Sequence, residues 1–268
     1  MIGHTPILVH HLPMKNHFLY MKKKTNPSIE IEKVYVLHVR KGYEDRDLHI
    51  RKMLGNMNIP FQYILDGDMT DLSIDSLSAY FRNDMLSITP ATSCSMKHIL
   101  AYQHMIDNHI QQALILEDDI LLARDFIRKF NQSMHEKEVI NKGGQMPITI
   151  SYEDTRLRFI PRSQRIKGKC LYPGKCDRMT GAYYLNLEAA CVIMDFAKKY
   201  QMDLPIDLTH NQLLREKRLN YYWMQPTIAT QGSHVGKFCS AINFQKSFIT
   251  PTLWKIQRLY KKILYFIR

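Results

Sequence analysis

The chain has 268 residues, of which 45% are hydrophobic and 23% are charged. This composition fits an ordinary globular protein, and the length suits one large domain or one domain with a substantial appendage. The formal net charge is +12, and after Glu216 the sequence has nine Lys or Arg residues and no acidic residue. The basic C-terminal part therefore predicts a contact with an anionic partner or surface.

The sequence has no apolar run of about eighteen residues, which excludes a membrane-spanning helix. The first 24 residues carry four histidines and end in Met21-Lys-Lys-Lys24, without the order of a secretory signal. We therefore expect a cytoplasmic protein. Its five cysteines are an odd number at irregular spacings, which favours free thiols over a disulfide framework.

Hydrophobic periodicity predicts an alternation of strands and helices after an N-terminal extension at residues 1–30. In chain order the predicted elements are a strand at 33–39, a helix at 44–58, strands at 61–65 and 112–116 separated by a helix at 95–109, a helix at 125–140, strands at 147–151 and 181–186, helices at 187–200 and 205–217, and a strand at 219–224. The first strand, helix and strand form a βαβ unit, which implies a parallel sheet. Residues 69–90 show a weak helical pattern, and the basic segment 153–178 is expected to be a mobile loop or hairpin.

The most informative motif is Glu117-Asp118-Asp119, which ends the apolar strand at 112–116. Adjacent carboxylates repel one another unless a positive group compensates them, and hard oxygen ligands select Mg²⁺ or Mn²⁺. Ligands of α/β sheets bind at the carboxyl ends of strands. We therefore interpret the motif as a metal site that receives a diphosphate. The alternative is a solvated acidic turn.

Several short blocks in a fixed order resemble glycosyltransferase family 25, the lipooligosaccharide-biosynthesis transferases. The blocks are Val34–Arg46, Asp66-Gly67, Cys94-Ser-Met-Lys-His98, Leu114–Asp119, Gly181–Leu185, Pro205-Ile-Asp207 and Gln225-Pro226. The resemblance spans roughly residues 33 to 245. The chain departs from the family at His38-Val39-Arg40, where the family has Asn-Leu-Asp, and at Lys97, where a Ser usually precedes the motif His.

The resemblance implies an α/β fold with a GT-A-like nucleotide-binding domain at residues 31–250, whose mixed, mostly parallel sheet is flanked by helices. It implies a metal-dependent, inverting glycosyltransferase that moves a hexose onto a lipooligosaccharide or another surface glycan. The expected donor substrate is a UDP-sugar, most simply UDP-galactose. The expected cofactor is Mn²⁺ or Mg²⁺.

The resemblance also implies roles for individual residues. Glu117 and Asp119 would hold the metal, with His234 as a final ligand. The donor would contact Val39, Arg40, Arg46, Asp66, Gly67, His98, Glu117 and Asp118. Asp207, near a predicted helix N-terminus, would be the base that takes a proton from the acceptor hydroxyl.

These roles have plain structural alternatives. Asp66 could belong to an Asp-Gly turn, and Asp207 could simply cap its helix. Arg40 and Arg46 could form a solvated helix face. His98 could pack in the core, and His234 could be an ordinary loop residue.

Residues 251–268 form a separate basic, amphipathic C-terminal segment with interleaved cations and large apolar side chains. This pattern predicts an interfacial helix attracted to anionic lipid, on the inner face of the cytoplasmic membrane. A lipid-carried acceptor would explain the need for such a helix. The alternative is a helix packed on the domain with its lysines directed outward.

Two other functions remain open on the sequence. A metal-dependent phosphodiesterase or nuclease would use acidic ligands and positive charge, although two-metal hydrolases usually take more carboxylates from separate strands. A non-catalytic nucleotide-sugar-binding relative could keep the fold without turnover. We expect no nucleic-acid partner.

Overall fold

The computed structural model describes residues 27–141, 144–239 and 249–268. The proposed N-terminal extension therefore lies mostly outside the described residues. All five cysteines are free thiols.

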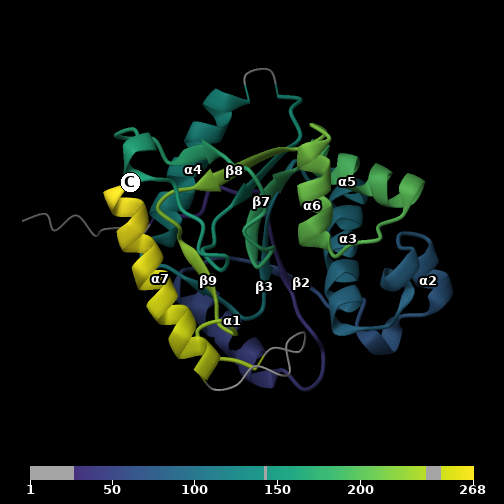
Figure 1. Cartoon of the computed structure of the whole chain (residues 1–268). Coiled ribbons are helices and arrows are strands. Elements are labelled where there is room, and N and C mark those ends of the chain that lie inside the picture. The colour runs from purple at the N-terminus through teal and green to yellow at the C-terminus, as the bar shows by residue number, and fades with distance from the viewer. Residues whose placement is uncertain (1–26, 142–143, 240–248) are drawn as a thin grey trace, which may run out of the picture.

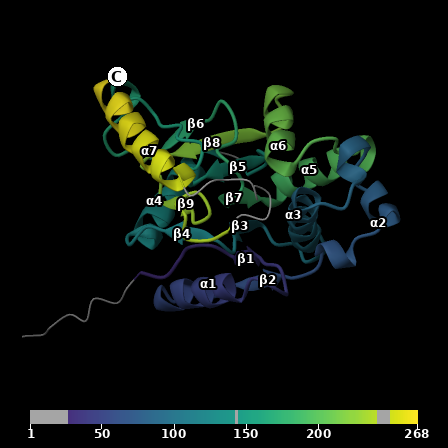
Figure 2. The same cartoon turned by 60° about the horizontal axis from the view of Figure 1, so that its bottom comes forward.

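The central sheet has seven strands in the spatial order β2-β1-β3-β7-β5-β8-β6. Their bounds are β1 (Lys33–Leu37), β2 (Gln62–Ile64), β3 (Gln112–Glu117), β5 (Ile148–Ser151), β6 (Leu171–Pro173), β7 (Ala182–Asn186) and β8 (Asn220–Met224). β1 pairs in parallel with β2 and β3, and β5 with β8, whereas β7 and β6 run antiparallel to their neighbours. The sheet is thus mixed and mostly parallel, as predicted, and Figure 2 shows it rising from β2 to β6.

Helices cover both faces of this sheet. Their bounds are α1 (Glu44–Asn56), α2 (Ile74–Ser78), α3 (Pro90–Asp107), α4 (Phe126–Ile140), α5 (Leu187–Tyr200), α6 (Ile206–Arg215) and α7 (Ile249–Ile267). α3, α5 and α6 lie together at one side of the sheet, with α2 beyond them, while α1 and α4 lie at the other side (Figures 1 and 2).

Each central strand contributes side chains to two hydrophobic cores, because successive side chains point to opposite faces of the sheet. Tyr35 and Leu37 of β1 belong to the core that includes residues of α3, α5 and α6. Val34 and Val36 belong to the core that includes residues of α1 and α4. A strand buried on both faces is apolar at nearly every position, which is why these segments could be recognised in the sequence.

Three parts of the chain differ from the prediction. α3 begins at Pro90 rather than Ser95, because the Thr89 side chain caps it by accepting a hydrogen bond from the Thr92 amide at 3.2 Å. The segment predicted as a loop or hairpin contains β6, which pairs with β8. A two-stranded antiparallel ribbon of β4 (Ile120–Leu122) and β9 (Ala229–Gln231) was not predicted at all.

The C-terminal helix is confirmed as α7, which runs along the outside of the molecule (Figure 1). Within the described ranges, none of the helices combines the length and the hydrophobicity needed to cross a bilayer.

Candidate active site

A cavity of about 730 Å³ opens at the carboxyl ends of β1 and β3. Leu37, the last residue of β1, and Glu117, the last residue of β3, both line it and are paired in the sheet register. The N-terminal parts of α3 and α6, residues 68–71, residues 179–180 and the segment that follows β9 also line it. The cavity therefore lies where α/β sheets usually bind ligands.

Seven of the predicted site residues line this cavity. They are Val39, Arg40, Arg46, Glu117, Asp119, Asp207 and His234. The fold thus brings the predicted metal ligands, the predicted base and both predicted phosphate-binding arginines to one place, although they come from distant parts of the chain.

Four predicted site residues do not belong to the cavity wall as far as the structure describes it: Asp66, Gly67, His98 and Asp118. The Asp66 side chain is 81% exposed and forms an ion pair with Arg40. The carbonyl of Gly67 accepts a hydrogen bond from Ser93 Oγ at 2.7 Å. His98 and Asp118 are buried beneath the cavity.

The three consecutive acids have different surroundings. Asp118 Oδ2 lies 2.7 Å from His38 Nδ1, and Asp118 Oδ1 accepts a hydrogen bond from Arg46 Nη1 at 2.9 Å. Asp118 is therefore compensated by the protein itself. Asp119 accepts a hydrogen bond from the Ser233 amide at Oδ2, but its buried Oδ1 has no hydrogen-bond partner among the described residues.

Glu117 and Asp119 carry charge that the protein compensates poorly. Burial, followed by repulsion from Asp119 and Asp118, raises the pKa of Glu117 to about 8. Burial also raises the pKa of Asp119, although Arg46 opposes this effect. A divalent cation would remove both penalties.

The donor atoms present fit such a cation. Glu117 and Asp119 offer carboxylate oxygens to the cavity, and His234 lines the same cavity with an imidazole. Oxygen donors of this kind suit Mg²⁺ or Mn²⁺. Since Asp119 Oδ1 is buried and has no hydrogen-bond partner in the part of the chain that the structure describes, a positive ligand would compensate this atom most directly.

Cys94 and His98 also place potential ligand atoms within 4.8 Å of one another and of Glu117. Burial raises the pKa of the Cys94 thiol well above its usual value. A thiol is also a softer ligand than the carboxylate oxygens that Mg²⁺ and Mn²⁺ prefer. His98 Nδ1 is 2.8 Å from the Tyr183 hydroxyl, and burial lowers the pKa of this histidine to about 3. His98 is therefore a neutral, buried histidine, and its Nε2 lies 3.7 Å from Glu117 Oε1.

Asp207 lies in the first turn of α6 and forms an ion pair of 2.5 Å with Arg156. Its side chain is only 13% exposed. Burial and the nearby Asp177 raise its pKa above the ordinary value of an aspartate. A cavity-lining carboxylate with a raised pKa is suited to accept a proton.

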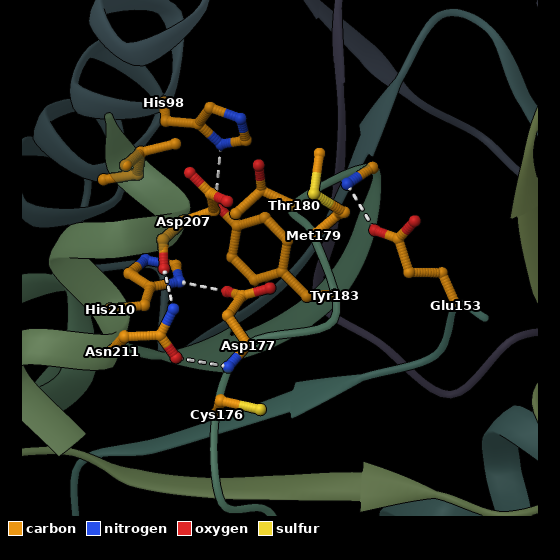
Figure 3. A network of polar contacts seen from close by, with 12 residues as sticks. His98, Glu153, Cys176, Asp177, Met179, Thr180, Tyr183, Asp207, His210 and Asn211 are labelled. Carbon is orange, nitrogen blue, oxygen red and sulfur yellow. Dashed lines mark hydrogen bonds and ion pairs between the residues drawn. The ribbon is translucent and has the colours of Figure 1, made fainter. Parts of the chain in front are cut away.

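A buried polar network fixes the start of α6 (Figure 3). Asn211 Nδ2 donates to the carbonyl of Asp207 at 3.0 Å, and Asn211 Oδ1 accepts from the Asp177 amide at 2.6 Å. Asp177 Oδ2 is 3.1 Å from His210 Nδ1. Because Asn211, Asp177 and His210 are buried, the network holds Asp207 at a defined place in the cavity wall.

The ribbon of β4 and β9 brings the last part of the wall to Asp119. Ile120 faces Gln231 in its register, and the Gly232 amide donates to the carbonyl of Asp119 at 2.8 Å. Ser233 and His234 follow directly and line the cavity. The ring of His234 lies 6.3 Å from that of Trp254 in α7.

Sequence reasoning missed several residues of the wall, including Asp68, Lys97, Thr180 and Ser233. Asp68, rather than Asp66, is the buried aspartate of Asp66-Gly67-Asp68, and it lies 2.7 Å from Lys97 Nζ. Asp66 and Asp68 lie on either side of Gly67, and nothing in the sequence indicates which of the two side chains is buried. Lys97 stands where the family usually has a Ser.

Together, the fold and the site define an α/β enzyme with carboxylates and arginines in one cavity at the carboxyl ends of two strands of its sheet. The model of glycosyltransferase family 25 (LPS biosynthesis protein) matches residues 31–210. The chain therefore belongs to glycosyltransferase family 25 and is a glycosyltransferase. No curated protein matches it.

Several solved structures share part of the architecture. A structure described as a glucose-1-phosphate thymidylyltransferase from Bacillus anthracis is 12% identical, covers 84% of this chain and 75% of its own, and has a TM-score of 0.39. A glycosyltransferase involved in glycosylation of the major capsid of PBCV-1 is 8% identical, with coverages of 86% and 99% and a TM-score of 0.39. Mouse xyloside xylosyltransferase 1 is 14% identical, with coverages of 72% and 73% and a TM-score of 0.35. The family assignment depends on the sequence match alone.

Proposed function

We propose that this protein transfers a hexose from a UDP-sugar, most simply UDP-galactose, to a lipooligosaccharide or another surface glycan, with inversion at the anomeric carbon. One observation carries the proposal: Glu117, Asp119 and Asp207 line a single cavity. In that cavity Glu117 and Asp119 would bind the charged donor at one wall, and Asp207 would accept a proton at another.

The donor diphosphate would lie near the carboxyl end of β3. Glu117 and Asp119, with His234, would hold Mn²⁺ or Mg²⁺ there. When bound, the cation supplies positive charge to the diphosphate that leaves. Arg46 lines the same cavity and is fixed by Asp118, so it offers the diphosphate a positioned positive charge.

Asp207 would accept the proton from the acceptor hydroxyl. The acceptor oxygen forms a bond to the anomeric carbon while the bond from that carbon to the β-phosphate oxygen breaks. The nucleoside diphosphate leaves with the bonding electrons, and the hydroxyl proton moves to the Asp207 carboxylate. A single displacement of this kind inverts the anomeric centre.

The decisive experiment is calorimetric titration of UDP, with and without Mn²⁺, into the wild type, Asp119→Asn and Asp125→Asn. Asp125 is a surface aspartate that pairs with Arg128, and it is a matched control for the loss of one carboxylate. We expect Mn²⁺-dependent binding in the wild type and the control and at least about a tenfold weaker affinity in Asp119→Asn. Equal binding in all three proteins would refute the metal site.

Family membership favours a glycosyltransferase over the phosphodiesterase or nuclease. Release of free galactose from UDP-galactose, or its transfer to a glycan, would support catalysis. Donor binding without either reaction would identify a non-catalytic relative.

A further inference from the structure

The C-terminal helix α7 is attached to the domain through an ion pair and a small hydrophobic cluster that Trp254 forms with Leu157 and Phe159. Arg258 forms an ion pair of 2.6 Å with Asp154, whose side chain is completely buried. Trp254 is buried and donates a hydrogen bond from Nε1 to the carbonyl of Thr155 at 3.1 Å. Near the C-terminal end of the helix, the ring of Tyr265 packs edge-on against Phe159. Positions 254, 258 and 265 share one face of a helix, so this face is the docked one.

The opposite side of α7 is apolar and faces outward. Its exposed residues are Leu253 (51%), Ile256 (60%), Leu259 (63%), Tyr260 (60%), Ile263 (51%), Phe266 (56%) and Ile267 (77%). A surface helix usually has the reverse arrangement, with its apolar stripe toward the core. Exposed apolar residues that form one continuous helix face mark an interaction site.

The surroundings of this apolar face are basic. Lys255, Lys261 and Lys262 belong to the same helix, with Lys262 Nζ 4.0 Å from Asp154 at the docked side, and the sequence from Lys217 to Arg268 has no acidic residue. The neighbouring segment 162–169 adds four cations, and Arg162 stacks on the ring of Phe266 with its guanidinium carbon 4.5 Å from the ring centroid. An apolar face bordered by cations complements the interface of an anionic bilayer. It does not complement a second copy of this chain, which would present the same positive charge.

We propose that α7 is a membrane-binding helix that lies in the plane of an anionic lipid surface, with the face from Leu253 to Ile267 inserted between the lipids. Its attachment through Arg258 and Trp254 leaves this face free for the bilayer. The N-terminal end of the helix adjoins the cavity wall, because Trp254 lies beside His234. A bound membrane would therefore lie next to the cavity, where a lipid-carried acceptor could enter.

The test is co-sedimentation of the full chain with vesicles. Vesicles of phosphatidylglycerol and phosphatidylethanolamine are compared with vesicles of phosphatidylcholine alone. We expect the wild type to bind the anionic vesicles, and the double variant Ile256→Glu/Ile263→Glu to bind at least about tenfold more weakly. The matched control is Leu48→Glu/Val139→Glu, which changes two exposed apolar residues elsewhere and should bind as the wild type does.

The proposal would be wrong if the wild type sedimented with neither kind of vesicle, or if the double variant bound as strongly as the wild type. Light scattering could also show a wild-type dimer that the double variant abolishes without any lipid binding, which would identify a second copy as the occupant. Both substituted residues are exposed, so circular dichroism should confirm an intact fold. UDP binding, measured in the same variants, keeps this test separate from the proposed donor site.

Discussion

Asp207 combines three properties at one residue: it lines the cavity, it contacts Arg156, and its pKa is raised by burial and by Asp177. The arginine fixes the carboxylate, while the raised pKa makes it a better proton acceptor than an ordinary aspartate. Both effects suit the proposed role of Asp207 as a base, which must be ionised before the reaction and protonated after it.

We therefore expect Asp207→Asn to lower kcat by about 10² to 10⁴-fold, with a small change in the donor KM. Because the base works only when deprotonated, wild-type kcat should fall as the pH falls through the raised pKa of Asp207. The amide cannot titrate there, so the variant should lose this acid limb. Steady-state transfer assays across pH measure both effects.

The matched control is Asp203→Asn, which removes a carboxylate from the loop before α6, where it pairs with Arg82 at 3.1 Å. This variant should keep the wild-type kcat and pH profile. If Asp207→Asn also retained its kcat, another group would have to be the base.

For single residues, the sequence indicates where charged side chains cluster but not which group compensates each charge. Three adjacent acids predicted a metal site, yet only the fold shows that Asp118 is paired with Arg46 while Asp119 Oδ1 is not paired within the described structure. Arg46 is far from the acids in the chain. Likewise, Asp66 and Asp68 are equivalent in the sequence, and only the turn at Gly67 decides which of them is buried.

Among the elements, the ribbon of β4 and β9 brings the segment around residues 231–234 to the acidic residues of the site. It places Gln231 beside Glu117 and Ser233 beside Asp119. The ribbon fits closely against the start of β7, because a Cβ atom at Gly181 would lie 2.6 Å from Gln231 Nε2. Close packing of this kind makes the position sensitive to a single methyl group.

We expect Gly181→Ala to lower the free energy of unfolding by about 1 to 3 kcal/mol, because the added methyl group must displace Gln231. Gly55→Ala is the matched control, since a Cβ atom at this position in α1 meets nothing within 4 Å. That change should raise stability by up to about 1 kcal/mol. Urea unfolding followed by circular dichroism measures both, and equal effects would contradict the predicted clash.

The elements that the sequence predicted best are long or buried on both faces. The helix at 187–200 coincides with α5, and the strand at 219–224 differs from β8 by one residue. The three-residue strands of the ribbon are too short to show a period, and their pairing joins segments far apart in the chain. The early start of α3 did have a sequence signal, since Thr89-Pro90 is a typical helix cap.

At the scale of the whole molecule, the proposed metal site would couple the binding of a cation to folding. Glu117 holds its proton more tightly in the folded state, where its pKa is about 8, than at its ordinary pKa of 4.5. This contribution to stability is complete below about pH 4.5 and is lost as the pH rises through about 8. A cation binds the deprotonated carboxylate, so it must compete with this proton.

Mn²⁺ should therefore stabilise the protein more at pH 8 than at pH 6. At a concentration about a hundredfold above its Kd, a bound ion adds about 2.7 kcal/mol, which raises Tm by roughly 5 to 10 °C for a chain of this size. Scanning calorimetry at both pH values measures the difference between protein with Mn²⁺ and protein with a chelator. Asp119→Asn should lose most of the Mn²⁺ effect, while Asp125→Asn should keep it. A Tm shift that is equal at both pH values, or that survives in Asp119→Asn, would mean that the ion binds away from Glu117 and Asp119.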